Sequence, residues 1–319
     1  MTIENTITTM SGSCELCKAE SELKQSHIIP KFIYKWKKKR NTGYFRSTQN
    51  PNRRIQDGIK PHLLCEVCEQ IIGKWEKQFA EKVFKPYHEK SISGFDHSDW
   101  LLKFAVSVSW RALSYVKMNN GLSHLSEIQT TLANQALETW RKYILGKEST
   151  IGPFTQHLLP LTYVKKAPGN GKLSPYLNRY IGTTTDIDVF RSEDTCLVYS
   201  KLDKLVVVGV VEQPSLDFFE GSQIESISER FNCELVQLPG DMFHYLNYRA
   251  DKYAEEVSNI SAKQWSSIEQ VYESKMDTLV DSEMIRATDM DFATSGKDAF
   301  NVMGTSKNTS KTPNNREDK

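Results

Sequence analysis

The sequence predicts an α+β protein: an N-terminal cysteine module, then a helical region, then a small β-sheet with C-terminal helices. Three observations support this fold class. Two Cys-x-x-Cys pairs lie near the N-terminus of the 319-residue chain, apolar residues then recur at helical spacing to about residue 144, and short β-branched runs follow between about 157 and 213. A change of apolar period from 3.6 to 2 marks the passage from helices to strands.

The composition describes a globular protein with room for two or three domains. Charged residues make up 25% of the chain and hydrophobic residues 39%, and no run of eighteen apolar residues occurs that could cross a membrane. The first ten residues lack the basic and apolar regions of a signal peptide. We therefore expect a cytoplasmic protein that does not engage a membrane.

The two Cys-x-x-Cys pairs predict a metal site. In a reducing compartment, such pairs are more often metal ligands than disulfides. Zinc takes four thiolates tetrahedrally at about 2.3 Å, and two pairs complete such a site. The expected ligands of a structural zinc are Cys14, Cys17, Cys65 and Cys68.

The residues around the two pairs predict the rest of the N-terminal module. Residues 32–37 could begin a helix or an extended basic arm, and residues 41–60 are rich in turn formers and predict a long loop. From Cys68 an apolar stripe at steps of three and four predicts a helix, which Pro86 should end. A cysteine pair, a hairpin region and a second pair that leads into a helix have the layout of a treble-clef zinc fold.

The remaining elements follow from local patterns. Helical spacing predicts helices over about 98–117, 123–144, 241–257 and 262–281, the last with Ser261 as N-cap. Strands are expected within the runs 157–164, 186–190, 195–199 and 205–211. The last run is apolar almost throughout, as in a strand buried on both faces.

Four units are expected along the chain. They are a zinc module with a basic loop (1–90), a helical region (91–150), an α+β accessory domain (151–285) and a flexible tail (286–319). From Gly304 to Lys319 no aliphatic or aromatic residue occurs, which predicts disorder. The accessory domain could sense a ligand, bind a protein partner or self-associate.

The net charge of +1 conceals a strongly basic segment. From Lys24 to His62 eleven Lys and Arg stand against one acid, Asp57, so this segment carries +10 and the rest of the chain −9. Aromatic residues alternate with the cations, and this combination favours phosphates and exposed bases of nucleic acid. A basic loop packed against the acidic remainder of the chain, or against an acidic protein partner, is the alternative. The expected nucleic-acid contacts are Lys35, Lys37, Lys38, Lys39, Arg40, Arg46, Arg53 and Arg54.

The order Cys-x-x-Cys, His27-Ile28-Ile29-Pro30, then Leu-Cys-x-x-Cys followed by a helix resembles the HNH endonucleases of the ββα-metal superfamily. The resemblance covers about residues 14–85. It implies an endonuclease that hydrolyses phosphodiester bonds with a divalent metal, in DNA rather than RNA. His27 would be the general base, and the helix after Cys68 would offer a metal ligand. By family analogy alone, such an enzyme could serve in phage defence or in a mobile element.

Three positions depart from the family pattern. Ser26 stands where a metal ligand usually precedes the base, Lys60 where a central Asn is usual (with Asp57 and His62 nearby), and Glu69 where His or Asn follows the last cysteine.

An altered ligand set could replace these residues. Glu69, Gly73 and Glu76 share one helix face, and carboxylate oxygens suit Mg²⁺ or Mn²⁺. The predicted catalytic residues are therefore His27, Glu69 and Glu76, with Glu69 as the ligand of the catalytic metal. Alternatively, Glu69 only complements the helix dipole and Glu76 lies on a solvated face.

Two rival functions remain open from the sequence. The first is a treble-clef module that binds nucleic acid without cleaving it. The second is a protein-interaction scaffold in which the basic segment meets an acidic partner.

Overall fold

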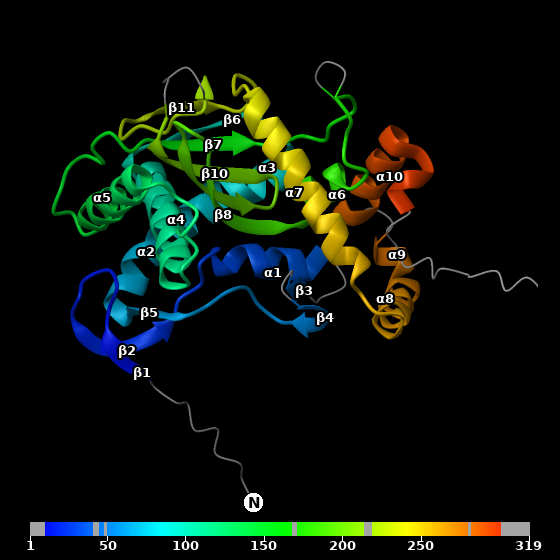
Figure 1. Cartoon of the computed structure of the whole chain (residues 1–319), viewed down its shortest axis with the longest axis horizontal. Helices are drawn as coiled ribbons and strands as arrows, with labels where there is room; N and C mark the ends of the chain where they lie inside the picture. The colour runs from blue at the N-terminus through cyan, green and yellow to red at the C-terminus, as the bar shows by residue number, and fades with distance from the viewer. Residues whose placement is uncertain are drawn as a thin grey trace, which may run out of the picture.

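The computed structural model describes residues 10–40, 45–47, 50–167, 171–213, 219–279 and 282–300. It is a mixed α/β fold around a four-stranded antiparallel sheet (Figure 1). The strand order is β7 (Gln156–Pro160), β10 (Leu205–Glu212), β9 (Cys196–Leu202) and β8 (Thr185–Arg191). All four predicted strands are confirmed. Every residue of β10 except Glu212 is buried, as the apolar run predicts for a central strand.

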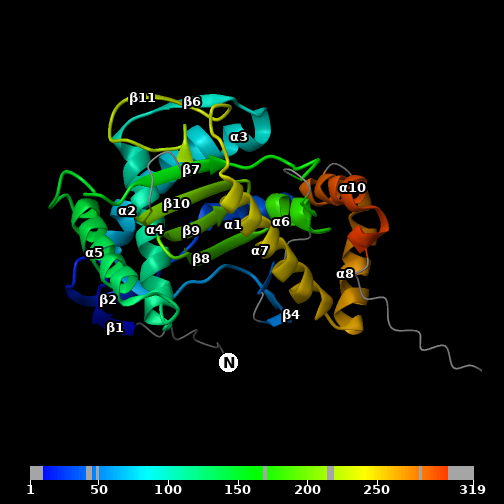
Figure 2. The same cartoon turned by 45° about the horizontal axis from the view of Figure 1, so that its top comes forward.

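Helices cover both faces of this sheet. Against one face pack α4 (Asp99–Met118) and α5 (Glu127–Ile144), and against the other lie α6 (Leu177–Thr183) and α7 (Gly240–Ser258) (Figure 2). The approach of α4 and α5 is close at Gly209 of β10, where a Cβ would lie 2.8 Å from atoms of both Ser109 and Trp140. These helices confirm the predicted segments 98–117, 123–144 and 241–257.

The N-terminal module is a second, smaller sheet with a helix. Strands β1 (Met10–Ser13), β2 (Glu20–Gln25) and β5 (His62–Cys65) pair antiparallel, and α2 (Glu66–Phe79) follows β5 directly. In this module Leu23 of β2 pairs with Cys65 at the end of β5. The second cysteine pair therefore begins a helix, as predicted.

The chain between β2 and β5 forms a helix and a hairpin. Residues 32–37 lie in α1 (Lys31–Arg40), which buries Ile33 and Tyr34. The predicted long loop contains β3 (Phe45–Ser47) and β4 (Asn50–Ile55), which pair with each other. Two-stranded hairpins lack a buried apolar face of their own, so the alternation that would predict them is weak.

The helix after the second cysteine pair runs past Pro86. It continues from α2 through a π-helical turn, η1 (Ala80–Phe84), into α3 (Lys85–Lys90), with the proline in the first turn of α3. The prediction that Pro86 ends the helix is wrong because the wider π turn accommodates a residue that has no backbone N–H to donate. The left-handed Ser91, with φ of 49°, ends it instead.

One hydrophobic core joins the predicted units. Buried residues of the N-terminal module, of α4 and α5 and of one sheet face form a single cluster that runs from Cys14 to Phe231. A separate pair of strands, β6 (Gly94–His97) and β11 (Glu229–Asn232), contributes Phe95 and Phe231 to it. The module therefore packs against the rest of the chain rather than standing apart.

The C-terminal part is helical to residue 300. Its elements are α8 (Ala262–Ser274), α9 (Met276–Leu279), α10 (Glu283–Ser295) and the 3₁₀ helix η3 (Gly296–Phe300). The predicted helix 262–281 is thus divided at Lys275. The start of the predicted flexible tail is packed, because the buried Asp291 lies 2.7 Å from Nε of the buried Arg179. The expected disorder of 304–319 lies outside the described residues.

No helix in the described ranges is both long and apolar enough to cross a membrane.

Candidate functional site

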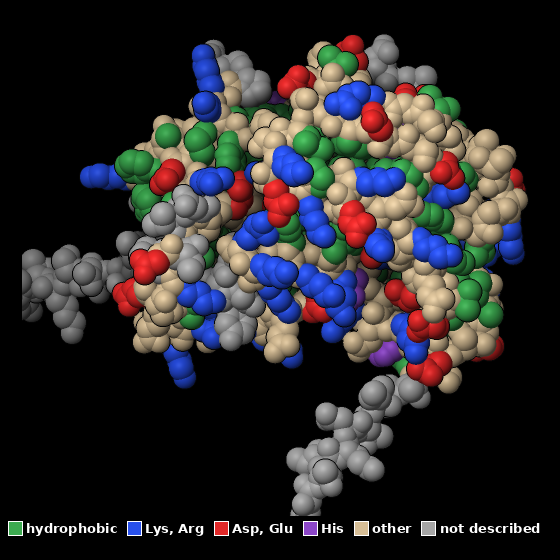
Figure 3. Space-filling view, turned by 180° about the vertical axis from the view of Figure 1, so that it is seen from behind, with side chains coloured by type: hydrophobic (Ala, Val, Ile, Leu, Met, Phe, Trp, Pro, Cys, Tyr) green, Lys and Arg blue, Asp and Glu red, His purple; other side chains and the backbone are tan. Residues whose placement is uncertain are grey.

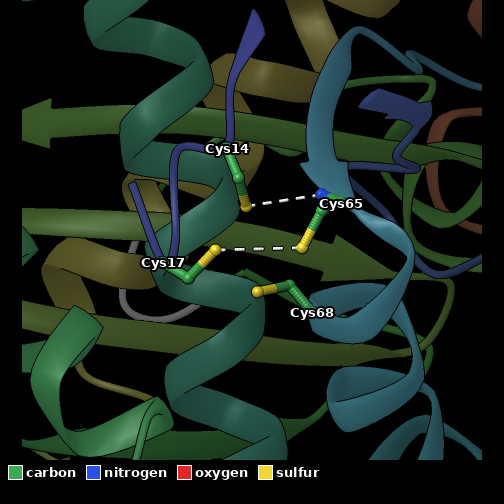
Figure 4. Close-up of side chains that lie close together, drawn as sticks. All are labelled: Cys14, Cys17, Cys65 and Cys68. Atoms are coloured by element: carbon green, nitrogen blue, oxygen red, sulfur yellow. Dashed lines mark hydrogen bonds between the residues drawn. The ribbon is translucent and has the colours of Figure 1, made fainter. Parts of the chain in front are cut away.

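The four cysteines of the two pairs converge. Cys14 and Cys17 lie in the turn between β1 and β2, Cys65 ends β5, and Cys68 lies in the first turn of α2. Their Sγ atoms are all within 4.8 Å of one another and point toward a common centre (Figure 4). Cys17 Sγ lies 3.8 Å from Cys65 Sγ. Tetrahedral zinc with bonds of about 2.3 Å sets its sulfurs about 3.8 Å apart, so this cluster could hold a zinc ion.

The surroundings of the cluster favour thiolates. The backbone N–H of Cys65 donates to Cys14 Sγ at 3.3 Å. Burial raises the pKa of Cys14, but hydrogen bonds from the backbone at Cys17, Cys65 and Leu16 outweigh it and lower the pKa to about 7. Burial, together with the neighbouring thiols, raises the pKa of Cys68. Because the thiolate is the ligand form, a cation is needed to stabilise several of them in so small a volume.

Most of the cluster is shielded from solvent. Cys14 is 0% exposed and Cys68 1%, while Cys17 is half-buried. A site in which four thiolates fill all the coordination positions is typical of a structural zinc, whereas a catalytic zinc keeps one position open for water or substrate. Within the described ranges no other group of three or more His, Cys, Asp or Glu side chains lies close enough to hold a metal in this way.

His27 lies in the loop between β2 and α1, next to Asp57. Its Nε2 is 2.9 Å from Asp57 Oδ2. This distance is short enough for a hydrogen bond, but the angles at the two atoms do not meet the criteria for one. Partial burial raises the pKa of Asp57, but His27, the Gly58 N–H and Lys60 outweigh burial and lower it. The aspartate therefore faces the imidazole as a carboxylate.

The backbone of His27 is held from inside the molecule. Its carbonyl accepts a hydrogen bond of 2.7 Å from Nη1 of Arg111, a buried residue of α4. The same Nη1 lies 2.7 Å from Glu76 Oε1 on α2. Arg111 is thus the buried ion-pair partner of Glu76, and this predicted catalytic carboxylate holds the loop of His27 through the guanidinium.

Glu69 differs from Glu76. It is half-buried near the start of α2, and its Oε1 is buried without a hydrogen-bond partner. One turn further along α2, a Cβ on Gly73 would have nothing within 4 Å, so the helix face beside Glu69 is open there. Of the two predicted carboxylates, Glu69 is the one with a buried oxygen that makes no hydrogen bond.

Ser26 takes a structural role. It is 0% exposed, and its Oγ accepts from the Leu64 N–H at 3.1 Å and donates to the Lys24 carbonyl at 3.3 Å. The side chain therefore links β2 to β5, where the register of the two strands shifts. Its hydroxyl is thus engaged both as a donor and as an acceptor within the sheet.

No family model, no curated protein and no solved structure matches this chain.

The predicted nucleic-acid contacts fall on two elements. Five lie on α1, and Arg46, Arg53 and Arg54 lie on the β3–β4 hairpin. Lys35, Lys39 and Arg53 are exposed. Lys and Arg side chains gather across the middle of the face seen in Figure 3, which is turned away from the viewer in Figure 1.

Two of the α1 cations pair with acidic residues of the same chain. Lys37 is 3% exposed, and its Nζ lies 3.2 Å from the buried Asp203, so it is not available to a phosphate. Arg40 stacks over Trp36 at 3.3 Å and pairs with Glu89 at 3.0 Å. The alternative of a basic segment packed against its own chain therefore holds for part of the segment.

Asp57 and Arg111 complete the site and are missing from the predicted set. Asp57 had a signal in the sequence, since it is the one acid among eleven basic residues. Arg111 lies 84 residues from His27 along the chain, and no local pattern relates the two.

Proposed function

We propose that the N-terminal module is an HNH-like, treble-clef endonuclease module that hydrolyses phosphodiester bonds of nucleic acid. The observation that carries the proposal is the contact of 2.9 Å between His27 Nε2 and Asp57 Oδ2, next to a four-cysteine cluster that could hold zinc. A histidine next to a carboxylate is a common general base. The resemblance of residues 14–85 to HNH endonucleases supports the same role for His27.

In this proposal His27 takes a proton from the attacking water. Asp57 stabilises the imidazolium that forms, because its charge lies at 2.9 Å. The water oxygen bonds to phosphorus, and the bond from phosphorus to the leaving sugar oxygen breaks. Arg111 and Glu76 keep the His27 backbone in place during the step.

A divalent cation would complete the chemistry. Glu69 is the residue that would hold Mg²⁺ or Mn²⁺, since its Oε1 is buried without a partner. Such ions keep several waters and take further oxygens from substrate phosphate, so one or two protein carboxylates suffice. The cation would stabilise negative charge on the leaving oxygen.

The exposed cations of α1 and of the hairpin would bind the substrate backbone. Lys35, Lys39 and Arg53 can each neutralise a phosphate. DNA as the substrate and a role in phage defence or a mobile element extend the proposal by family analogy alone.

The test is cleavage by the zinc-loaded full chain and by His27→Ala. We expect the wild type to nick DNA with Mg²⁺ or Mn²⁺, and the variant to keep its zinc and its melting temperature but to lose about 10²–10⁴-fold in rate. His62→Ala is the matched control, because His62 lies on β5 and the ion pairs of Asp57 in the described part of the chain are with His27 and Lys60. Undiminished cleavage by His27→Ala would contradict the assignment.

A second candidate is a module that binds nucleic acid without cleaving it. It is favoured by Ser26 and Glu76, both of which are engaged in structural contacts where a metal site would need free ligands. This candidate predicts no cleavage by the wild type with any divalent metal, together with DNA binding that weakens steeply with salt.

A further inference from the structure

Four lysines share the solvent side of α1. Lys31, Lys35, Lys38 and Lys39 follow one another at helical spacing, so their side chains leave the same side of the helix. Lys31, Lys35 and Lys39 are exposed, and Lys38 is half-buried. The helix buries its opposite side in the protein. We call these four residues the lysine face.

The lysine face has no carboxylate partners. α1 contains no acidic residue, and within the described ranges none of the four lysines takes part in an ion pair. By contrast, Lys37 and Arg40 of the same helix each pair with a carboxylate. Like charges four residues apart destabilise a helix, and so does a cation at its N-terminus, where Lys31 lies. An anionic partner would relieve both effects.

The length of the lysine face matches a short run of phosphates. From Lys31 to Lys39 the helix rises about 12 Å, at about 1.5 Å per residue. One strand of B-DNA carries a phosphate about every 3.4 Å along the duplex axis. When α1 lies along a strand, the lysine face therefore spans about three or four phosphates.

The aromatic side chains of α1 pack against the protein itself. Phe32 and Trp36 are half-buried, and their ring centroids lie 5.3 Å and 5.5 Å from that of Phe84. The exposed residues of α1 are all Lys or Arg. This surface therefore lacks both the exposed rings that stack on bases and the apolar centre of a typical protein interface. It suits the sugar–phosphate backbone, which carries no sequence information.

The lysine face begins beside His27. Tyr34, in the first turn of α1, has its ring centroid 6.1 Å from that of His27. At the other end of the helix, Arg40 pairs with Glu89 of α3. A strand bound along α1 would thus have one end near the proposed base and extend away from it in one direction.

We propose that the lysine face binds three or four consecutive phosphates of one nucleic-acid strand, on one side of the cut and without selecting its sequence. The position of the cut rests on the nuclease proposal, because it is set by His27. Binding of the strand does not rest on it.

Fluorescence anisotropy of the zinc-loaded full chain with a labelled DNA duplex, without added Mg²⁺ or Mn²⁺, tests the binding. The triple variant carries Lys31→Gln, Lys35→Gln and Lys39→Gln, and Gln has a helix propensity close to that of Lys. We expect at least tenfold weaker binding. The slope of log Kd against log salt should fall by about 2 to 3, since each phosphate contact contributes about 0.9. The variant should keep its zinc and its melting temperature, and A·T-rich and G·C-rich duplexes should bind alike.

The matched control carries Lys147→Gln, Lys165→Gln and Lys166→Gln. These three lysines are also exposed, form no ion pair in the described part of the chain, and lie outside α1. The control loses the same charge and should keep the affinity and the salt slope of the wild type. His27→Ala should keep both as well, so that failure of the nuclease proposal and failure of this one are distinguishable.

Neutral linkages test the direction of the strand. In cleavage by the wild type with Mg²⁺ or Mn²⁺, a run of about four methylphosphonates is placed on one side of the cut or on the other. We expect cleavage to slow at least tenfold for one side only. The triple variant should lose nothing further from the same run.

Each outcome decides the proposal. An unchanged salt slope in the triple variant, or an equal loss in the control, would overturn it. Polyglutamate that competes as well as DNA would also overturn it, in favour of an acidic protein partner. Equal effects of neutral linkages on both sides of the cut would contradict the one-sided position. A wild type that binds with the expected slope but does not cleave would contradict the nuclease proposal alone.

Discussion

At the scale of single residues, Asp57 and Arg111 hold His27 from two sides. Asp57 lies against the imidazole, and Arg111 holds the carbonyl of the same residue. Tyr34 packs beside them, with its ring centroid 6.1 Å from that of His27, and burial raises its pKa to about 12. The position of the proposed base thus depends on side chains from three parts of the chain.

Gly58, the residue after Asp57, makes room for Tyr34. A Cβ at this position would lie 2.0 Å from Tyr34 Cζ, and the ring is buried and cannot move aside freely. We expect Gly58→Ala to lower the free energy of unfolding by about 1–3 kcal/mol, as other cases of overpacking do. Urea denaturation measures the change.

A double-mutant cycle supplies the control for Gly58→Ala. In a Tyr34→Ala background the added methyl group has space, so most of the penalty should disappear. Equal penalties in both backgrounds would show that the ring is not the cause.

At the scale of elements, periodic apolar patterns predicted the central sheet and its helices, because burial of one face is a local property of the sequence. The patterns failed where local rules compete with packing. Pro86 was expected to end a helix that in fact continues through a π turn, and the hairpin of β3 and β4 has no apolar face to reveal it.

The candidate site was predictable to a smaller extent. The spacing of the cysteine pairs was enough to predict their cluster, since two Cys-x-x-Cys turns in one module are typical of a shared metal site. The contacts of Arg111 with His27 and Glu76 were not predictable, because Arg111 comes from a different helix and these contacts exist only after packing.

Strand β7 contains a buried histidine that should make the fold sensitive to acid. His157 is 1% exposed, lies between Thr155 and Ser222, and burial lowers its pKa to about 4. Between pH 6.5 and about 4 the unfolded chain binds a proton that the folded chain does not, so stability falls as the pH falls. The expected contribution is about 3 kcal/mol across this range.

His157→Asn removes the titrating group and isolates its contribution from that of other groups. The difference in the free energy of unfolding between wild type and variant should shrink as the pH falls from 6.5 to 4. A difference that stays constant over this range would contradict the assignment to His157.

At the scale of the whole molecule, the N-terminal module is tied to α4, to α5 and to the central sheet. Arg141 of α5 donates to the Leu16 carbonyl at 3.0 Å, beside the cysteine cluster. Lys37 of α1 reaches Asp203 of the β9–β10 turn, and Arg111 of α4 reaches His27. Because these contacts are buried or half-buried, the module and the sheet should unfold together.

We expect the four cysteines to hold one structural zinc, around which the N-terminal module is organised. X-ray absorption at the zinc edge of the purified full-length protein tests it most directly. We expect one zinc per chain with four sulfur neighbours at about 2.3 Å, and we expect Cys65→Ser to lose bound zinc and thermal stability. A folded protein without zinc, or zinc bound mainly by nitrogen and oxygen, would contradict it.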